Sequence, residues 1–195
     1  MKIACVQMDV TIGAIEANLT KMISRVEVAA EESCDLVIFP ECSLTGYCFE
    51  SLAEAQQFAQ PIPGLATERM QSLSTRLNLH IVFGMLESEG DRIYNVACCI
   101  GPSGVVGKYR KVHLPKLGVD HFVTPGDRPF EVLDIGQCRV GMLICYDASF
   151  PEASRCLMLQ GADLIVLPTN WPPGAEPTSE HVINARSSEN HIYFA

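Results

Sequence analysis

Short apolar runs alternate with longer amphipathic stretches along this chain, and that alternation constrains the fold more than any other feature. The runs Lys2–Met8 and Asp35–Phe39 have the length and composition of strands. The stretch between them, from about Ile15 to Glu32, has the periodicity of a helix. The sequence therefore predicts a β-α-β unit at the start of an α/β fold.

The middle of the chain has a different organisation. A helix is predicted from about Thr67 to Leu77, and three apolar runs follow it, at His80–Leu86, Arg92–Ile100 and Val105–Arg110. Only turns that contain glycine separate these runs, so we expect antiparallel strands here.

The last third returns to alternating strands and helices. Strands are predicted at Phe130–Ile135, Arg139–Ile144 and Asp163–Leu167, helices near Pro151–Gln160 and Pro177–Glu189, and a final run from His191. The hydrophobic content is 48%, with no repeat and no linker, so residues 1–195 are interpreted as one domain with a mixed sheet core and outer helices. The chain stops at Ala195 within a run typical of a strand, and we expect the domain to be incomplete at this end.

Charge and cysteine usage exclude several classes of function. The 14 basic residues face 23 acidic ones, giving a net charge of −9, which argues against a nucleic-acid partner. There is no signal-peptide pattern and no apolar run near the ~18 residues of a membrane span, so no membrane partner is predicted. Nine cysteines lie mostly within apolar patterns, as in a reducing compartment, and a cytoplasmic location is predicted. The spacing typical of a zinc site is missing.

Cys145 is the first candidate for chemistry. It follows the buried run Val140–Ile144 and precedes Tyr146–Glu152, which opens a helix. Such a junction exposes a thiol at the carboxyl edge of a sheet, and a helix amino terminus would favour its thiolate. From this context alone, a nucleophile and a buried core cysteine remain equally good interpretations.

Glu41 and Lys111 also lie at the ends of predicted strands. Glu41 follows Phe39-Pro40 beside apolar walls, where desolvation would raise its pKa and suit it to act as a general base. Taken singly, Glu41 is more simply a loop glutamate and Lys111 part of a solvated basic face. Together with Cys145 they indicate a site, because ligands of α/β sheets bind at carboxyl strand ends.

Three segments containing these residues resemble the signature segments of the nitrilase, or carbon-nitrogen hydrolase, superfamily, in its amidase-like branch. They are Phe39-Pro40-Glu41, Tyr109 through Pro115, and Ile144-Cys145-Tyr146-Asp147 with Phe150-Pro151-Glu152. Supporting matches in the same order are Thr45-Gly46-Tyr47, Thr124-Pro125-Gly126-Asp127, Gly161-Ala162-Asp163, Pro168-Thr169-Asn170-Trp171 and Ala185 through Asn190. The resemblance covers essentially the whole chain.

The resemblance implies a four-layer α-β-β-α sandwich, truncated at its C-terminus, since the family's fold continues with several strands after His191–Ala195. It also implies pairing into homodimers or higher oligomers through the helices near Pro151–Gln160 and Pro177–Glu189.

The implied activity is hydrolysis of a non-peptide C–N bond in a small amide or N-carbamoyl compound, through a thioester on Cys145. Glu41 would be the base, while Lys111 and the backbone N–H of Tyr146 would stabilise the oxyanion. No metal or organic cofactor is implied. Tyr47, Asn170 and Trp171 would line the substrate side, and Asn170-Trp171 follows a strand that should lie beside the strand before Cys145.

The sequence departs from the family pattern at one position, and three other functions compete with amide hydrolysis. Many members carry a second glutamate after the lysine, whereas Lys116–Phe122 offers only Asp120. A nitrilase acting on a cyano group is disfavoured because Tyr146-Asp147 follows the cysteine where that branch has Trp-Glu. A glutaminase domain of an amidotransferase and a catalytically silent binding protein on the same fold also remain open.

Overall fold

Two β-sheets lie face to face between helices in the computed structural model, which describes residues 1–195. The first sheet contains, in spatial order, β1 (Ile3–Cys5), β2 (Leu36–Ile38), β3 (His80–Glu89), β4 (Arg92–Gly101) and β5 (Gly104–Arg110). Strands β1, β2 and β3 are parallel, because α1 (Ile15–Glu31) and α3 (Leu65–Leu77) carry the chain back between them. Short turns make β3, β4 and β5 antiparallel, as predicted.

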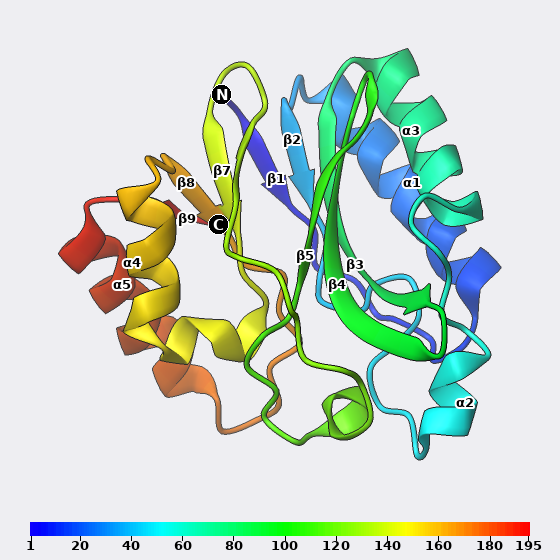
Figure 1. Ribbon diagram of the computed structural model, residues 1–195. Coiled ribbons are helices and arrows are strands. Elements are labelled where there is room, and N and C mark those ends of the chain that lie inside the picture. Colours follow the sequence, from blue (N-terminus) through cyan, green and yellow to red (C-terminus); the bar gives the residue numbers. More distant parts are fainter.

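The second sheet is smaller and also mixed. Its order is β6 (Val132–Asp134), β7 (Arg139–Met142), β8 (Leu164–Val166) and β9 (Tyr193–Phe194). Strand β6 is antiparallel to β7, whereas β7, β8 and β9 are parallel and are connected through α4 (Pro151–Leu159) and α5 (Ile183–Asn190). Figure 1 shows α1 and α3 on one outer side of the sandwich and α4 and α5 on the other.

Alternation of side chains along the strands divides the first sheet between two cores. Val82 and Tyr109 belong to the core between the two sheets, whereas Phe83 and Cys98 belong to the core under α1 and α3. All four are buried, and burial of apolar area of this kind is the main force that holds the layers together. The predicted four-layer α-β-β-α sandwich is therefore confirmed.

Most differences from the predicted elements are at their ends. Strand β1 is shorter than the predicted run Lys2–Met8, because its partner β2 ends at Ile38 and the last bond between them runs from the Val6 N–H to the Ile38 carbonyl. A short helix, α2 (Leu52–Gln56), was not predicted; the Ser51 hydroxyl caps it by accepting the Glu54 N–H. None of the helices combines the length and the hydrophobicity that a membrane-spanning segment needs.

Candidate active site

The turn after β2 buries the Glu41 carboxylate. This turn packs directly on β3 at Gly84, where an added Cβ would lie 2.3 Å from the Cys42 nitrogen and 2.7 Å from the Glu41 Cα. Glycine is thus required for the close approach. Glu41 is 1% exposed, and its Oε2 accepts the backbone N–H of Asn170 at 3.2 Å.

Lys111 follows β5 and places its ammonium between two carboxylates. Its backbone N–H donates to the Asn95 carbonyl at 2.8 Å, which continues the pairing of β5 with β4. The Nζ atom lies 2.7 Å from Glu41 Oε1 and 2.5 Å from Asp120 Oδ2, and all three side chains are 0% exposed. Two of the three ammonium protons are therefore held by carboxylates, leaving one for another acceptor.

Asp120 comes from the 3₁₀ turn Gly118–His121 and lies within this cluster. Besides Lys111, its carboxylate accepts the Tyr47 hydroxyl at 2.9 Å and the Asn95 side-chain amide at 3.0 Å. The structure thus places Asp120, the acid that Lys116–Phe122 offers where many family members carry a second glutamate, beside Lys111 and Glu41.

Asn95 on β4 is a member of the cluster that the sequence interpretation missed. Its side-chain amide donates both to Glu41 Oε1, at 2.8 Å, and to Asp120 Oδ1. A signal was present, because Asn95 is the one amide side chain in the otherwise apolar and aromatic run Ile93–Ile100. A buried amide within a central strand needs partners, and its partners here are two carboxylates.

Cys145 begins a 3₁₀ turn, Cys145–Ser149, three residues after β7 ends at Met142. Its φ is 46°, a left-handed conformation that is uncommon for a residue other than glycine and that recurs at functional turns. Its backbone N–H donates to the Pro168 carbonyl at 3.1 Å, and the residue is 7% exposed. The Glu41 carboxylate lies close enough to the thiol to raise its pKa.

The cluster shifts the pKa of each of its three central groups. Burial raises the pKa of Glu41 above its ordinary value, although the Lys111 ammonium opposes this effect. Burial alone would lower the pKa of Lys111, but the Glu41 and Asp120 carboxylates outweigh it and raise that pKa. Burial and then the Glu41 carboxylate raise the pKa of Cys145. These directions favour the neutral thiol of Cys145 and the ammonium form of Lys111.

The prediction that a helix amino terminus favours the thiolate of Cys145 is wrong in direction, because the pKa of this thiol is raised. Helix α4 begins only at Pro151, after the 3₁₀ turn, so its end is not adjacent to the thiol. Lys111 does lower this pKa, as does the Asn170 backbone N–H, but burial and Glu41 have the larger effect.

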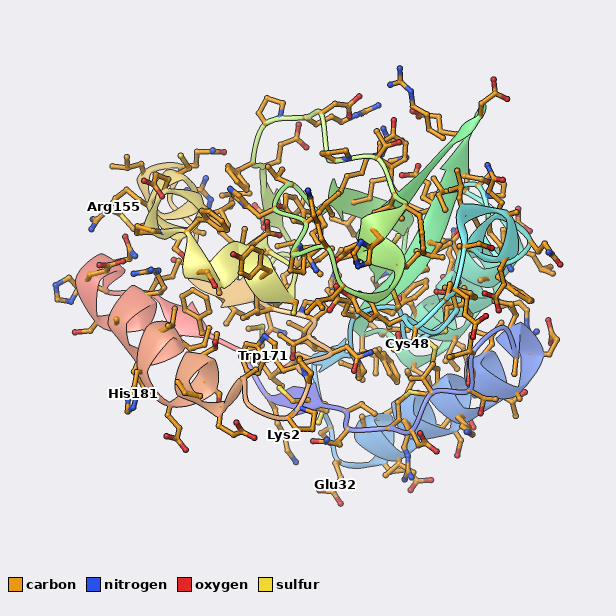
Figure 2. All side chains as sticks on the ribbon, turned by 90° about the horizontal axis from the view of Figure 1, so that it is seen from below. Lys2, Glu32, Cys48, Arg155, Trp171 and His181 are labelled. Atoms are coloured by element: carbon orange, nitrogen blue, oxygen red, sulfur yellow. The ribbon has the colours of Figure 1, made fainter.

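The remaining predicted residues occupy three different places. Asn170 and Trp171 line a cavity of about 610 Å³ together with Glu41. In Figure 2, Trp171 lies between helix α5 and helix α1. Tyr47 is buried, with its ring 5.8 Å from the Lys111 Nζ, within the range of a cation–π contact. The Tyr146 side chain is 39% exposed and packs edge-on against Phe150.

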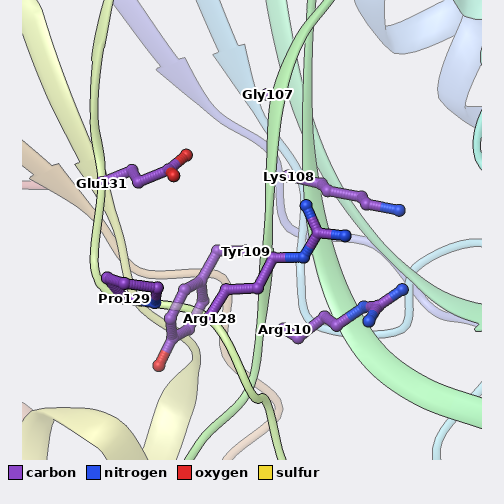
Figure 3. A pocket seen from close by; sticks show the side chains of 7 residues that line it. All are labelled: Gly107, Lys108, Tyr109, Arg110, Arg128, Pro129 and Glu131. Atoms are coloured by element: carbon purple, nitrogen blue, oxygen red, sulfur yellow. The ribbon is translucent and has the colours of Figure 1, made fainter.

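A second cavity, of about 180 Å³, lies elsewhere and contains none of these residues (Figure 3). Its lining residues are Gly107, Lys108, Tyr109, Arg110, Arg128, Pro129 and Glu131. Buried Glu87 pairs with both Lys108 and Arg110 at this end of the first sheet, and Arg110 also pairs with Glu89 and Asp127.

The sequence is similar to those of known proteins over nearly its whole length. The family model described as carbon-nitrogen hydrolase matches residues 2–195. A protein named nitrilase from Pyrococcus abyssi is 38% identical over 99% of this chain and 72% of its own length. An (R)-stereoselective amidase from a Pseudomonas species is 33% identical over 99% of this chain and 69% of its own length.

Solved structures show the same fold. Saccharomyces cerevisiae Nit3, a member of branch 10 of the nitrilase superfamily, matches with a TM-score of 0.88 at 23% identity, over 100% of this chain and 73% of its own. An amidase from Nesterenkonia sp. AN1, as a double mutant in complex with acrylamide, matches with a TM-score of 0.86 at 24% identity, over 100% of this chain and 74% of its own. The match over residues 2–195 and the similarity to the Pyrococcus abyssi protein establish that this chain belongs to the carbon-nitrogen hydrolase, or nitrilase, superfamily.

Proposed function

We propose that this protein hydrolyses the C–N bond of a small amide or N-carbamoyl compound through a thioester on Cys145. The observation that carries the proposal is the buried cluster in which Lys111 bridges Glu41 and Asp120 while Cys145 lies beside Glu41 on a left-handed turn. A buried carboxylate with a raised pKa, adjacent to a thiol, is the pairing that covalent catalysis by cysteine requires.

In the proposed mechanism Glu41 removes the proton of Cys145 as the sulfur attacks the carbonyl carbon of the substrate. Because the thiol and the carboxyl interact, they titrate as a coupled pair, and one proton is held between them before attack. The tetrahedral oxyanion accepts the remaining ammonium proton of Lys111 and the backbone N–H of Tyr146, and each such donor contributes ~3–4 kcal/mol.

Collapse of the intermediate breaks the C–N bond. Protonated Glu41 gives its proton to the departing amine or ammonia, and the acyl group remains on Cys145 as a thioester. Glu41 then takes a proton from a water molecule, which attacks the thioester; the C–S bond breaks, the carboxylic acid leaves, and Glu41 returns the proton to the Cys145 sulfur. Asp120 and Asn95 fix Lys111 and Glu41 throughout, because their hydrogen bonds hold both charged groups in place.

Trp171 and Tyr47 are proposed to lie on the substrate side. Trp171 shares a cavity with Glu41, and Tyr47 faces the Lys111 ammonium, so both are near the point where a carbonyl would be bound. Replacing Trp171 with alanine should raise the KM for amides more than it lowers kcat.

A cyano group is the second candidate substrate, favoured by the relative named nitrilase at 38% identity. Tyr146-Asp147 after the cysteine favours the amide. Ammonia release from primary amides, N-carbamoyl compounds, glutamine and nitriles distinguishes these substrates. Amide or carbamoyl turnover supports the proposal, turnover of nitriles or glutamine alone replaces it with a nitrilase or a glutaminase, and no turnover at all favours a binding protein.

Two cysteine variants make this experiment specific. Cys145→Ala should abolish ammonia release while the circular dichroism spectrum stays that of the wild type. Cys156→Ser is the matched control, because Cys156 is exposed on α4, and this variant should retain full activity. Amide hydrolysis that survives in Cys145→Ala would refute the covalent mechanism.

We also propose that copies of this chain pair through α4 and α5. Leu159 at the end of α4 is 74% exposed, a large apolar side chain on the outer layer. Leu159→Glu should lower the molar mass measured by light scattering. Leu65→Glu, at an apolar residue 59% exposed on α3 in the opposite layer, should leave it unchanged.

A further inference from the structure

The Asp147 carboxylate, two residues after Cys145, is fully buried and accepts four hydrogen bonds. Its Oδ2 accepts the Ile144 backbone N–H at 3.0 Å and the Tyr109 hydroxyl at 2.9 Å. Its Oδ1 accepts the His113 backbone N–H at 3.0 Å and faces the His113 Nδ1 at 2.7 Å. Both oxygens thus use both of their lone pairs, and the mechanism proposed above assigns this carboxylate no step.

The four donors come from the two segments that carry Lys111 and Cys145. Tyr109 and His113 lie two residues before and two residues after Lys111, and Ile144 directly precedes Cys145. Figure 3 shows the Tyr109 side chain extending away from the charged ends of Lys108 and Arg110, as alternation along β5 requires. Asp147 therefore joins the Lys111 segment to the turn that carries the thiol.

The turn needs such restraint, because Cys145 is held at a φ of 46°. A left-handed residue other than glycine persists only where its surroundings hold it there. Asp147 holds Ile144, the residue before Cys145, by accepting its backbone N–H. At the other end of the turn, Arg186 donates to the carbonyls of Ala148, at 3.0 Å, and Ser149, at 3.2 Å. Burial and the Asp147 carboxylate raise the pKa of Tyr109, so its hydroxyl remains a donor.

We propose that Asp147 is a positioning residue, which fixes the Cys145 sulfur relative to Lys111 and Glu41 by bonding the two segments to one carboxylate. It touches no reacting atom in this role. The effect on turnover rests on the proposed amide hydrolysis, but the effect on the thiol itself does not.

The test is Asp147→Asn, which keeps the shape of the side chain and replaces one accepting oxygen with an NH₂ group. That group cannot accept from the Ile144 or the His113 backbone N–H, so one of these two backbone hydrogen bonds is lost. We measure kcat and KM for the amide found active, and the rate at which iodoacetamide alkylates Cys145, followed by peptide mass spectrometry. Both kcat and the alkylation rate should fall by about tenfold or more while KM changes little, since small misplacements of a reacting group have effects of this size.

Glu87→Gln is the matched control. Glu87 is also a buried carboxylate, 1% exposed. It accepts a hydrogen bond from Arg110 Nε at 2.7 Å and pairs with Lys108, and neither partner belongs to the cluster around Lys111. The same exchange of oxygen for NH₂ should lower the melting temperature of the protein and leave kcat and the alkylation of Cys145 unchanged. This control separates loss of stability from loss of position.

Tyr109→Phe keeps the inference testable if Asp147→Asn does not fold, because it removes one donor to Asp147 and retains the ring. It should lower the alkylation rate and kcat by at least about twofold, as expected for one lost bond among four. If Asp147→Asn folds, wild-type values of its alkylation rate and kcat would overturn the inference. If Asp147→Asn does not fold, wild-type values in Tyr109→Phe would do so. A wild-type protein that alkylates at Cys145 but hydrolyses no amide would overturn the proposed function alone.

Discussion

Removing the Lys111 ammonium should destabilise the protein more than the loss of any exposed ion pair. In Lys111→Met the side chain keeps a similar volume, but Glu41 and Asp120, both 0% exposed, lose their shared cation. Breaking a buried ion pair by removing one partner costs about 3–5 kcal/mol, because the other charge is left uncompensated. We expect the free energy of unfolding at pH 7 to fall by this amount, a large share of the 5–15 kcal/mol typical of folded proteins.

The loss should depend on pH, with a sign that follows from the carboxyls. Burial already raises the pKa of Glu41, and Lys111 opposes that rise, so removal of the ammonium raises the pKa further in the folded state. The folded variant then binds protons more tightly than the unfolded chain, and its stability increases as pH falls from 7 towards the ordinary carboxyl pKa. The difference between Lys111→Met and the wild type in free energy of unfolding should therefore be smaller at pH 5 than at pH 7. Lys111→Met with Asp120→Asn should recover part of the loss, because one of the two charges is gone.

Urea unfolding followed by circular dichroism at pH 7 and pH 5 measures these quantities. Lys108→Met is the matched control, because Glu87 keeps its 2.7 Å bond to Arg110 when Lys108 is removed. The control should lose about 1–2 kcal/mol, similarly at both pH values. The reasoning would be refuted if Lys111→Met lost no more free energy of unfolding than the control, or lost the same amount at both pH values.

Three further predictions concern the same cluster. The acid limb of kcat/KM for an amide should lie above the ordinary glutamate pKa of 4.5, because burial raises the pKa of Glu41 and the carboxylate form is the base; a limb at or below 4.5 contradicts this. Asn95→Leu removes a hydrogen-bond donor from both Glu41 and Asp120, so it should lower the free energy of unfolding in urea by about 2–4 kcal/mol. It should also move the acid limb of kcat/KM to higher pH, and an acid limb that does not move would count against the role of Asn95. Gly84→Ala places a Cβ 2.3 Å from the Cys42 nitrogen, so it should lower the free energy of unfolding by about 1–3 kcal/mol. It should also lower kcat by shifting the turn that carries Glu41. Wild-type kcat in a folded variant would show that this turn does not move.

The kind and order of the elements could be predicted from the sequence because local periodicity determines them. The helix predicted from about Ile15 to Glu32 is observed at Ile15–Glu31, and the strand predicted at Val105–Arg110 is observed at Gly104–Arg110. Both patterns reflect which side chains face the core, and that is a property of a few neighbouring residues. The chemistry of Glu41, Lys111 and Cys145 was also visible, since each is the residue type its proposed role requires at the end of a strand.

The partners of these residues depended on the tertiary structure. Glu41 and Lys111 are 70 residues apart, and only the register of β3, β4 and β5 brings them to 2.7 Å with Asn95 between the carboxylates. The predicted direction of the Cys145 pKa failed for the same reason. The sequence shows a helix following the thiol, but burial and a carboxylate from a distant strand determine its proton affinity, and both exist only once the two sheets have packed together.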